Sequence, residues 1–175
     1  MLADDSAEQR PAVLVTFEGD ECRRRWLAEG RVDFLEVFCG FQELTFRVRE
    51  CGLNASDGID NKVVSMGQVW PLEVEEVRKQ CAWLIVKALQ PLCVHSGTPC
   101  THMSMIGKQD HETHANSPML VQFAIAICEH QDSLRRLASN ENPSGSMLPL
   151  EEQWVAAFGR PEAPKGNWRY VKSDG

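Results

Sequence analysis

The chain has 175 residues, enough for one domain with a buried core, and its 43% hydrophobic and 25% charged residues are an ordinary globular balance. A formal net charge of −7 argues against unaided binding of duplex DNA, which usually requires a basic face. No apolar run approaches the roughly 20 residues of a membrane-spanning helix.

The composition also bears on the cellular compartment. Residues 1–10 are polar and acidic, unlike a secretory signal. Seven cysteines without regular spacing favour reduced thiols over a disulfide framework. We therefore expect an intracellular protein, in the nucleus or the cytoplasm, that is not secreted.

Strands and helices alternate along the first part of the chain. A short strand at Ala12–Phe17 and a charged helix at Asp20–Glu29 are predicted first. A compact apolar strand follows at Val32–Phe38. Helical spacing of apolar residues then predicts a helix over Gln42–Cys51, and a second strand is predicted over Leu53–Ile59.

The same alternation continues further along the chain. Periodic apolar residues predict a helix over Leu72–Leu89, and the apolar run Leu92–Ser96 reads as a strand. A strongly apolar helix is predicted from Pro118 to Glu129, and it is expected to continue to about Arg136. A short strand at Leu137–Asn140 and an amphipathic helix at Leu150–Phe158 follow. This order implies βαβ units and a mostly parallel sheet.

Two stretches lack a periodic apolar face. Lys108–Ser117 is polar, and a loop is predicted there. Gly159–Gly175 is rich in proline, glycine and charge, and we expect the domain to be truncated there.

A glycine and two acids form the first group of candidate functional residues. Gly40 ends the strand that contains Glu36, and Asp60 follows at the distance, about 20 residues, from which an acid can bind ribose hydroxyls. One glycine in place of GxGxxG disfavours a dinucleotide, and Glu36 would repel a phosphate. A positively charged, phosphate-free cofactor such as S-adenosylmethionine fits better. The alternative is a tight turn with two surface acids.

A cysteine and a glutamate form the second group. The turn Gly97-Thr98-Pro99-Cys100 follows a predicted strand and presents a thiol, which is a strong nucleophile once its pKa is lowered. A buried, inert cysteine is the alternative. Glu141-Asn142-Pro143 follows the next predicted strand, either as a positioned proton donor or as a simple turn.

The order of these motifs resembles the catalytic half of DNA cytosine-5 methyltransferases. The motifs that carry the resemblance are Glu36-Val37-Phe38-Cys39-Gly40, then Asp60, then Gly97-Thr98-Pro99-Cys100, then Glu141-Asn142-Pro143, over about residues 32–145. The resemblance implies a Rossmann-like class I S-adenosylmethionine-dependent methyltransferase fold, a mostly parallel α/β sheet with flanking helices. It implies an N-terminal extension at 1–31, a catalytic domain at 32–160 and a C-terminal segment at 161–175.

The resemblance also implies roles for single residues. The cofactor pocket would comprise Glu36, Phe38, Gly40, Asp60, Gln68 and Pro99. Within it, Asp60 would hold the ribose hydroxyls and Gln68 the adenine amino group. Cys100 would attack C6 of a cytosine flipped out of the stack, and Glu141 would bond to N3 and the exocyclic amine. Recognition of DNA would require a further region or a partner.

Two other interpretations remain. Zinc is suggested by Cys93-x-His95, Cys100-x-His102 and His111-x-x-His114, but a single intervening residue suits one metal poorly, and we expect no metal. The chain can also be a non-catalytic Rossmann-like module of a larger or mobile-element polyprotein, with or without cofactor binding.

Overall fold

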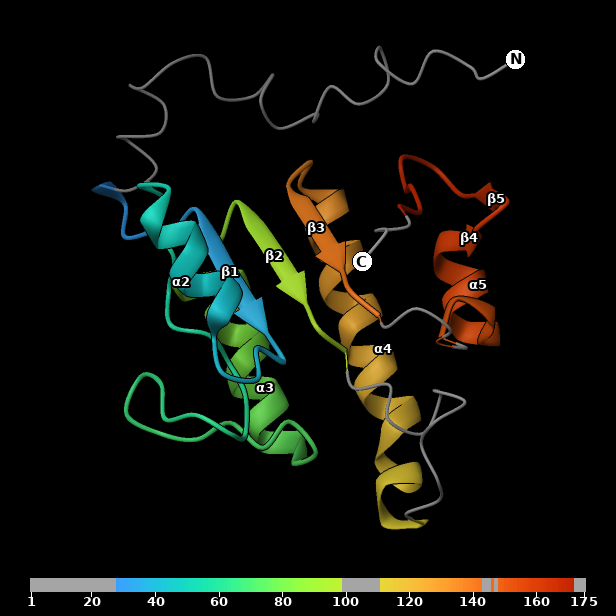
Figure 1. Ribbon diagram of the computed structural model, residues 1–175, viewed down its shortest axis with the longest axis horizontal. Helices are drawn as coiled ribbons and strands as arrows, with labels where there is room; N and C mark the ends of the chain where they lie inside the picture. The colour runs from blue at the N-terminus through green and yellow to red at the C-terminus, as the bar shows by residue number, and fades with distance from the viewer. Residues whose placement is uncertain (1–27, 99–110, 143–145, 147, 172–175) are drawn as a thin grey trace.

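The computed structural model describes residues 28–98, 111–142, 146 and 148–171, which form mixed α/β structure (Figure 1). Its centre is a parallel sheet of β1 (Phe34–Val37), β2 (Cys93–Ser96) and β3 (Leu137–Asn140), in the spatial order β1-β2-β3. The predicted parallel sheet is confirmed for these three strands. β3 has the predicted bounds, and β1 and β2 lie within the predicted ranges.

The predicted strand at Leu53–Ile59 forms only isolated bridges. Ala55 pairs with Phe34, and the last residue of the stretch pairs with Val37, both in parallel. The partners are 21 positions apart at the first bridge and 22 at the second, so one extra residue in the stretch interrupts a regular ladder. The stretch nevertheless runs along β1, on the side away from β2.

One face of the sheet carries the main core. It packs against α3 (Glu75–Trp83), the π-helix Leu84–Ala88 and α4 (His111–Ser133). Each large side chain buried there stabilises the fold by about 1.5–3 kcal/mol relative to exposure. The core consists of Leu35, Val37, Ile59, Trp70, Leu72, Cys81, Ile85, Val94, Leu120 and Ile127.

The other face is more polar. Helix α2 (Glu43–Glu50) packs against β1 on this face, which is the near face in Figure 1, with α3 and α4 behind the sheet. On the same face Ser139 of β3 is exposed and His95 of β2 is half-buried. Parallel sheets are usually apolar on both faces, so these side chains mark an unusual surface.

A second, smaller core joins the C-terminal part of the described chain to α4. It involves a 3₁₀-helix at Leu148–Leu150, α5 (Glu152–Phe158), and a hairpin of β4 (Gly159–Arg160) and β5 (Ala163–Pro164). No periodic pattern in the sequence predicts this hairpin, because two-residue strands are too short to show one. The core consists of Val121, Ile125, Cys128, Leu148, Trp154 and Phe158.

The start of α4 corrects the prediction of a loop over Lys108–Ser117. The helix already begins at His111, and Pro118 lies inside it rather than at its start. The loop was inferred from a missing apolar stripe, but a helix extends at little cost beyond its packed segment, because each added residue gains a backbone hydrogen bond. The helix also ends at Ser133, before the predicted Arg136.

The predicted N-terminal strand at Ala12–Phe17 and most of the predicted helix at Asp20–Glu29 lie outside the described residues. Within the described ranges, none of the helices combines the length and the apolar character needed to cross a membrane.

Candidate functional site

The carboxyl ends of the three strands meet at one edge of the sheet, the edge at which open α/β sheets bind ligands. β1 continues into Phe38-Cys39-Gly40, β2 into Gly97-Thr98 and β3 into Glu141-Asn142. The chain passes from β1 to the 53–59 stretch on one side and later to β2 on the other. The strand order therefore reverses between β1 and β2, which is where such sheets form a crevice.

The turns after β1 and β2 touch through backbone atoms. The N–H of Gly97 donates to the Val37 carbonyl oxygen at 3.0 Å. A Cβ placed on Gly97 would lie only 2.9 Å from the carbonyl oxygen of Phe38. Phe38 itself has a φ of 58°, a left-handed conformation that is rare for a non-glycine residue. The contact explains why the turn before Cys100 needs a glycine.

Asp60 links the glycine turn to the end of the neighbouring stretch. Its Oδ2 accepts a hydrogen bond from the N–H of Gly40 at 3.0 Å, and its Oδ1 accepts one from the N–H of Lys62 at 2.9 Å. Each carboxylate oxygen has a second lone-pair direction, so the group can still receive hydroxyl donors. Two of the six residues predicted to form the cofactor pocket, Gly40 and Asp60, are thus brought together.

Glu36 lies against the N-terminus of α2. Its Oε2 accepts hydrogen bonds from the backbone N–H and the hydroxyl of Thr45, at 2.9 and 2.6 Å. Both residues are buried, and the negative charge complements the positive end of the helix. Glu36 therefore holds α2 on β1, and its predicted role beside the cofactor stays a prediction.

Of the two cysteines in the candidate motifs, Cys39 and Cys100, only Cys39 lies among the described residues. Cys39 is buried, and burial, followed by the nearby charges of Asp60 and Glu36, raises the pKa of its thiol to about 12. It therefore stays protonated and unreactive at neutral pH. The predicted nucleophile Cys100 and the preceding Pro99 lie outside the described residues.

A chain of hydrogen bonds ties the turn after β2 to the end of β3. Asn142 donates from Nδ2 to Oδ1 of Asn140, whose Nδ2 donates to Oγ1 of Thr98 at 2.6 Å. The Thr98 hydroxyl is also 2.9 Å from that of Ser96. The N–H of Glu141 donates to the Ser96 carbonyl oxygen at 3.0 Å, which extends the β2–β3 pairing to the predicted catalytic glutamate.

His95 is a candidate that the sequence analysis considered only as a metal ligand. Its Nδ1 is 2.9 Å from Oγ of Ser139, and its Nε2 is 3.8 Å from Oε2 of Glu141. Burial lowers the pKa of the imidazole, while Glu36 and Glu141 raise it. The signal in the sequence is a histidine among apolar residues in a strand, but the pairing with Ser139 depends on strand register.

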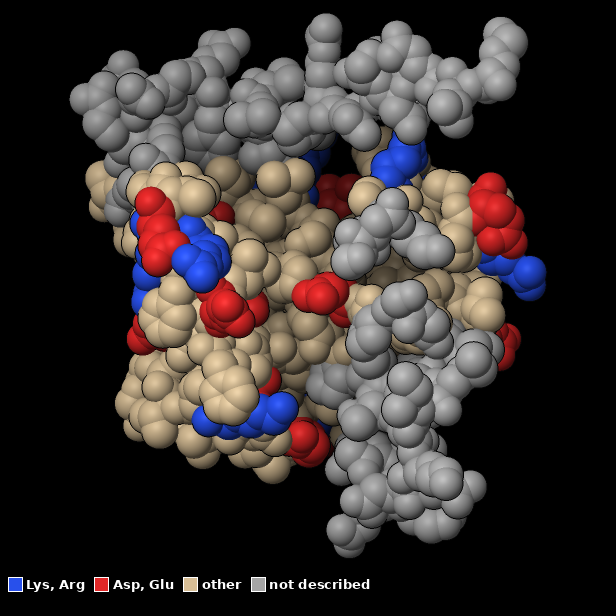
Figure 2. Space-filling view, in the orientation of Figure 1, with Lys and Arg blue, Asp and Glu red and all other residues tan. Residues whose placement is uncertain are grey.

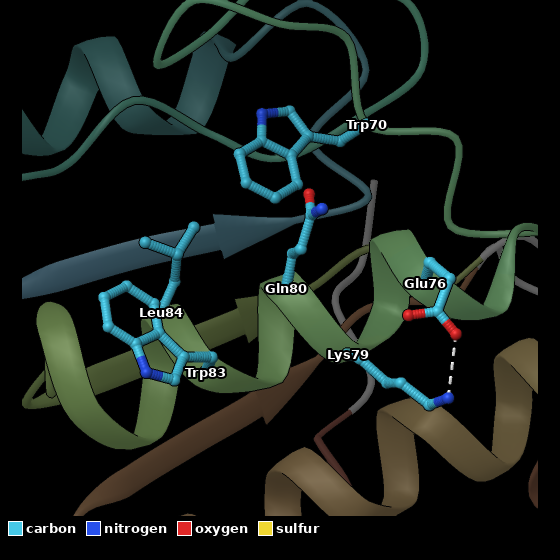
Figure 3. Close-up of a pocket in the computed structure, with 6 residues that line it drawn as sticks. All are labelled: Trp70, Glu76, Lys79, Gln80, Trp83 and Leu84. Atoms are coloured by element: carbon cyan, nitrogen blue, oxygen red, sulfur yellow. Dashed lines mark hydrogen bonds and ion pairs between the residues drawn. The ribbon is translucent and has the colours of Figure 1, made fainter.

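Gln68 lies in an exposed tight turn closed by backbone bonds with Ser65. Its Nε2 donates to Oε1 of Gln80 at 3.3 Å. Gln80 extends toward Trp70 in a groove of about 410 Å³, which also includes Glu76, Lys79, Trp83 and Leu84 (Figure 3). The N–H of Trp70 donates to the Asp60 carbonyl oxygen at 3.1 Å, so the groove adjoins the candidate cofactor residues.

The described residues were also compared for the distribution of charge and for groups of side chains that could bind a metal ion. Acidic and basic side chains are interspersed on the face in Figure 2, with uncharged surface between them. Within the described part of the chain, no three His, Cys, Asp or Glu side chains are grouped in a way that could hold a metal ion. The cysteine at 100, the histidine at 102 and the side chains at 111 and 114 are not among those residues.

Comparisons with models of protein families, with curated proteins and with solved structures give no significant match to this chain.

Proposed function

We propose that this protein has a Rossmann-like class I methyltransferase fold and transfers a methyl group from S-adenosylmethionine to C5 of cytosine in DNA. One observation carries the proposal. Phe38, Gly40, Asp60 and Glu141 all lie at the carboxyl edge of the parallel sheet, around the reversal of strand order between β1 and β2. That edge is where cofactors bind in sheets of this kind.

The residues at this edge fit the proposed cofactor. A Cβ added to Gly40 would meet nothing within 4 Å, so a ligand has room to approach this backbone. Asp60 offers carboxylate oxygens to the ribose hydroxyls, and its own position is set by Gly40 and Lys62. The buried charge of Glu36 favours a cation over a phosphate. The cofactor, when bound, supplies an electrophilic methyl group.

The protein's own residues prepare the base. Addition of the Cys100 thiolate to C6 forms an S–C6 bond and moves the π electrons of the C5–C6 bond to C5, which becomes nucleophilic. Glu141 donates a proton to N3 and so stabilises the developing negative charge. Its side chain is 77% exposed, within reach of a base that has left the stack. After methylation, a water molecule takes the C5 proton, the C5–C6 double bond re-forms as the Cys100 thiolate leaves, and N3 returns its proton to Glu141.

The negative net charge of the chain opposes binding to DNA unless another region or protein supplies positive charge. The net charge is −7, and phosphate contacts supply most of the affinity of DNA-binding proteins. We therefore propose that a further region or a partner protein holds the DNA, while this domain acts on the extruded base.

The proposal is tested by trapping the covalent intermediate. The protein is incubated with S-adenosylmethionine and DNA that contains 5-fluorocytosine, whose fluorine blocks release of the cysteine. We expect a covalent protein–DNA adduct that is lost in Cys100→Ser. Cys39→Ser and Cys51→Ser are the matched controls, one buried and one exposed, and both keep the adduct.

The adduct must depend on Cys100 alone among these three cysteines. Adduct formation that survives Cys100→Ser contradicts the assigned nucleophile. Absence of both an adduct and calorimetric binding of S-adenosylmethionine would favour the non-catalytic module.

A further inference from the structure

A row of polar residues crosses the face of the sheet that α2 covers in part. Glu36, His95 and Ser139 are register partners on β1, β2 and β3. Glu141 follows Ser139 by two residues, so its side chain points to the same face. Apolar side chains are the rule on both faces of a parallel sheet. A histidine between two carboxylates at the carboxyl edge therefore requires a chemical explanation.

The two ring nitrogens of His95 face different neighbours, Ser139 and Glu141. Nδ1 lies 2.9 Å from the hydroxyl of Ser139, and Nε2 lies 3.8 Å from the carboxylate of Glu141. Glu36 is hydrogen-bonded to Thr45 and influences His95 through its charge. The His95 side chain is 13% exposed and that of Glu141 is 77% exposed. A fixed ring thus stands beside a long, solvated side chain.

We propose that His95 is a positioning residue for Glu141, an inference that rests on the proposed methyl transfer. With Nδ1 held by Ser139, Nε2 is turned toward Glu141 and restricts the directions in which its carboxyl group points. Orientation matters because a proton donor that is misplaced by about 1 Å can lose a factor of roughly 10² in rate. Burial lowers the pKa of His95, which favours the neutral imidazole beside Glu141.

The pairing can be measured without substrate. The imidazole C–H signals of His95 in the full chain, identified by their loss in His95→Gln, are followed by NMR through a pH titration. Glu141→Gln removes a negative charge and is expected to lower the pKa of His95 by about half a unit. Glu162→Gln, an exposed acid beside the β4–β5 hairpin, is the control and leaves it unchanged. Equal titration curves in the wild type and Glu141→Gln overturn the inference.

The catalytic consequence is measured by steady-state methyl transfer. His95→Ala is expected to lower kcat about 10-fold with little change in the KM for S-adenosylmethionine, because the affected group faces the base. His95→Gln, which keeps an N–H donor, retains more activity than His95→Ala. Wild-type kcat in His95→Ala overturns the inference and leaves the proposed function standing. Wild-type protein without methyl transfer counts against the proposed function, and the NMR titration then decides the pairing by itself.

Discussion

The backbone N–H of Gly40 donates a hydrogen bond to Oδ2 of Asp60 at 3.0 Å, across 20 residues of sequence. The bond joins the turn after β1 to the end of the stretch that runs beside it. Helix α2 lies between the two in sequence, so the contact closes the passage from β1 through α2 to the 53–59 stretch. It also fixes the carboxylate at the carboxyl edge of the sheet.

We first predict that Asp60→Ala weakens binding of S-adenosylmethionine at least about 10-fold, because the proposed hydrogen bonds to the ribose hydroxyls would be lost, and a hydrogen bond to a charged acceptor is worth about 1.5–3 kcal/mol. Isothermal titration calorimetry measures the affinity, and circular dichroism confirms that the variant is folded. Asp57→Asn is the matched control, since Asp57 lies nearby in sequence but pairs with Arg49 at 2.7 Å. Equal affinity in Asp60→Ala and wild type would show that the ribose lies elsewhere.

The second prediction concerns the contact between the turns after β1 and β2. Gly97→Ala is expected to lower the free energy of unfolding by about 1–3 kcal/mol, because the new methyl group meets the backbone oxygen of Phe38, which cannot rotate away. Urea denaturation measures the change. Gln122→Ala, on an exposed position of α4, should stay within about 0.5 kcal/mol of wild type. A Gly97→Ala variant of wild-type stability would mean that the two turns separate easily.

The third prediction tests how Glu36 holds α2. Glu36→Gln should lower the free energy of unfolding by about 1–2 kcal/mol, since a charged acceptor at a helix N-terminus becomes neutral. Adding Thr45→Val should cost less than the sum of the two single changes, because they share one interaction. Glu43→Gln, exposed in the first turn of α2, serves as the control for charge alone. If the two changes lower the free energy of unfolding additively, the hydrogen bond between Glu36 and Thr45 does not contribute to stability.

The fourth prediction is a dependence of stability on pH. Burial lowers the pKa of His95 in the folded chain below its unfolded value of about 6.5, so the unfolded chain binds more protons as the pH falls. The free energy of unfolding should therefore decrease from about pH 7.5 to 5.5, a range that spans the unfolded pKa. Burial, with Arg136 as a further cause, lowers the pKa of His130 in the same direction.

Urea denaturation at several pH values measures this dependence. His95→Gln should show a smaller decrease than wild type, and a double variant with His130→Gln a smaller one still. The same slope in wild type and His95→Gln would show that His95 does not resist protonation in the folded state.

The predictable part of the fold was the part with a strong local pattern. β3 has the bounds expected for Leu137–Asn140, and α2 lies within the range Gln42–Cys51, because apolar runs and glycine stops are local signals. The start of α4 was not predictable from an apolar stripe, since its first turns extend past the packed region. The predicted strand at Leu53–Ile59 is reduced to bridges because one extra residue shifts its register between the two pairings with β1.

Part of the candidate site could likewise be predicted from local sequence patterns, and part could not. Gly40 and Asp60 were chosen from their spacing, and they are hydrogen-bonded to each other. Spacing along the chain does not predict the neighbours of Glu141, because these depend on which residues face each other across β2 and β3. His95 and Ser139 are 44 residues apart and meet only through that register. Cys100 was selected by its motif alone and lies outside the described residues.

The length of α4 has a consequence for access to the strand ends. A helix of 23 residues is about 35 Å long, whereas a four-residue strand spans about 13 Å. α4 therefore overhangs the sheet, and Figure 1 shows its N-terminal half continuing beyond the arrowheads of the three strands. The overhang forms a wall behind the carboxyl edge. The first turns of α4 thus continue past the strand ends on the face of the sheet opposite α2.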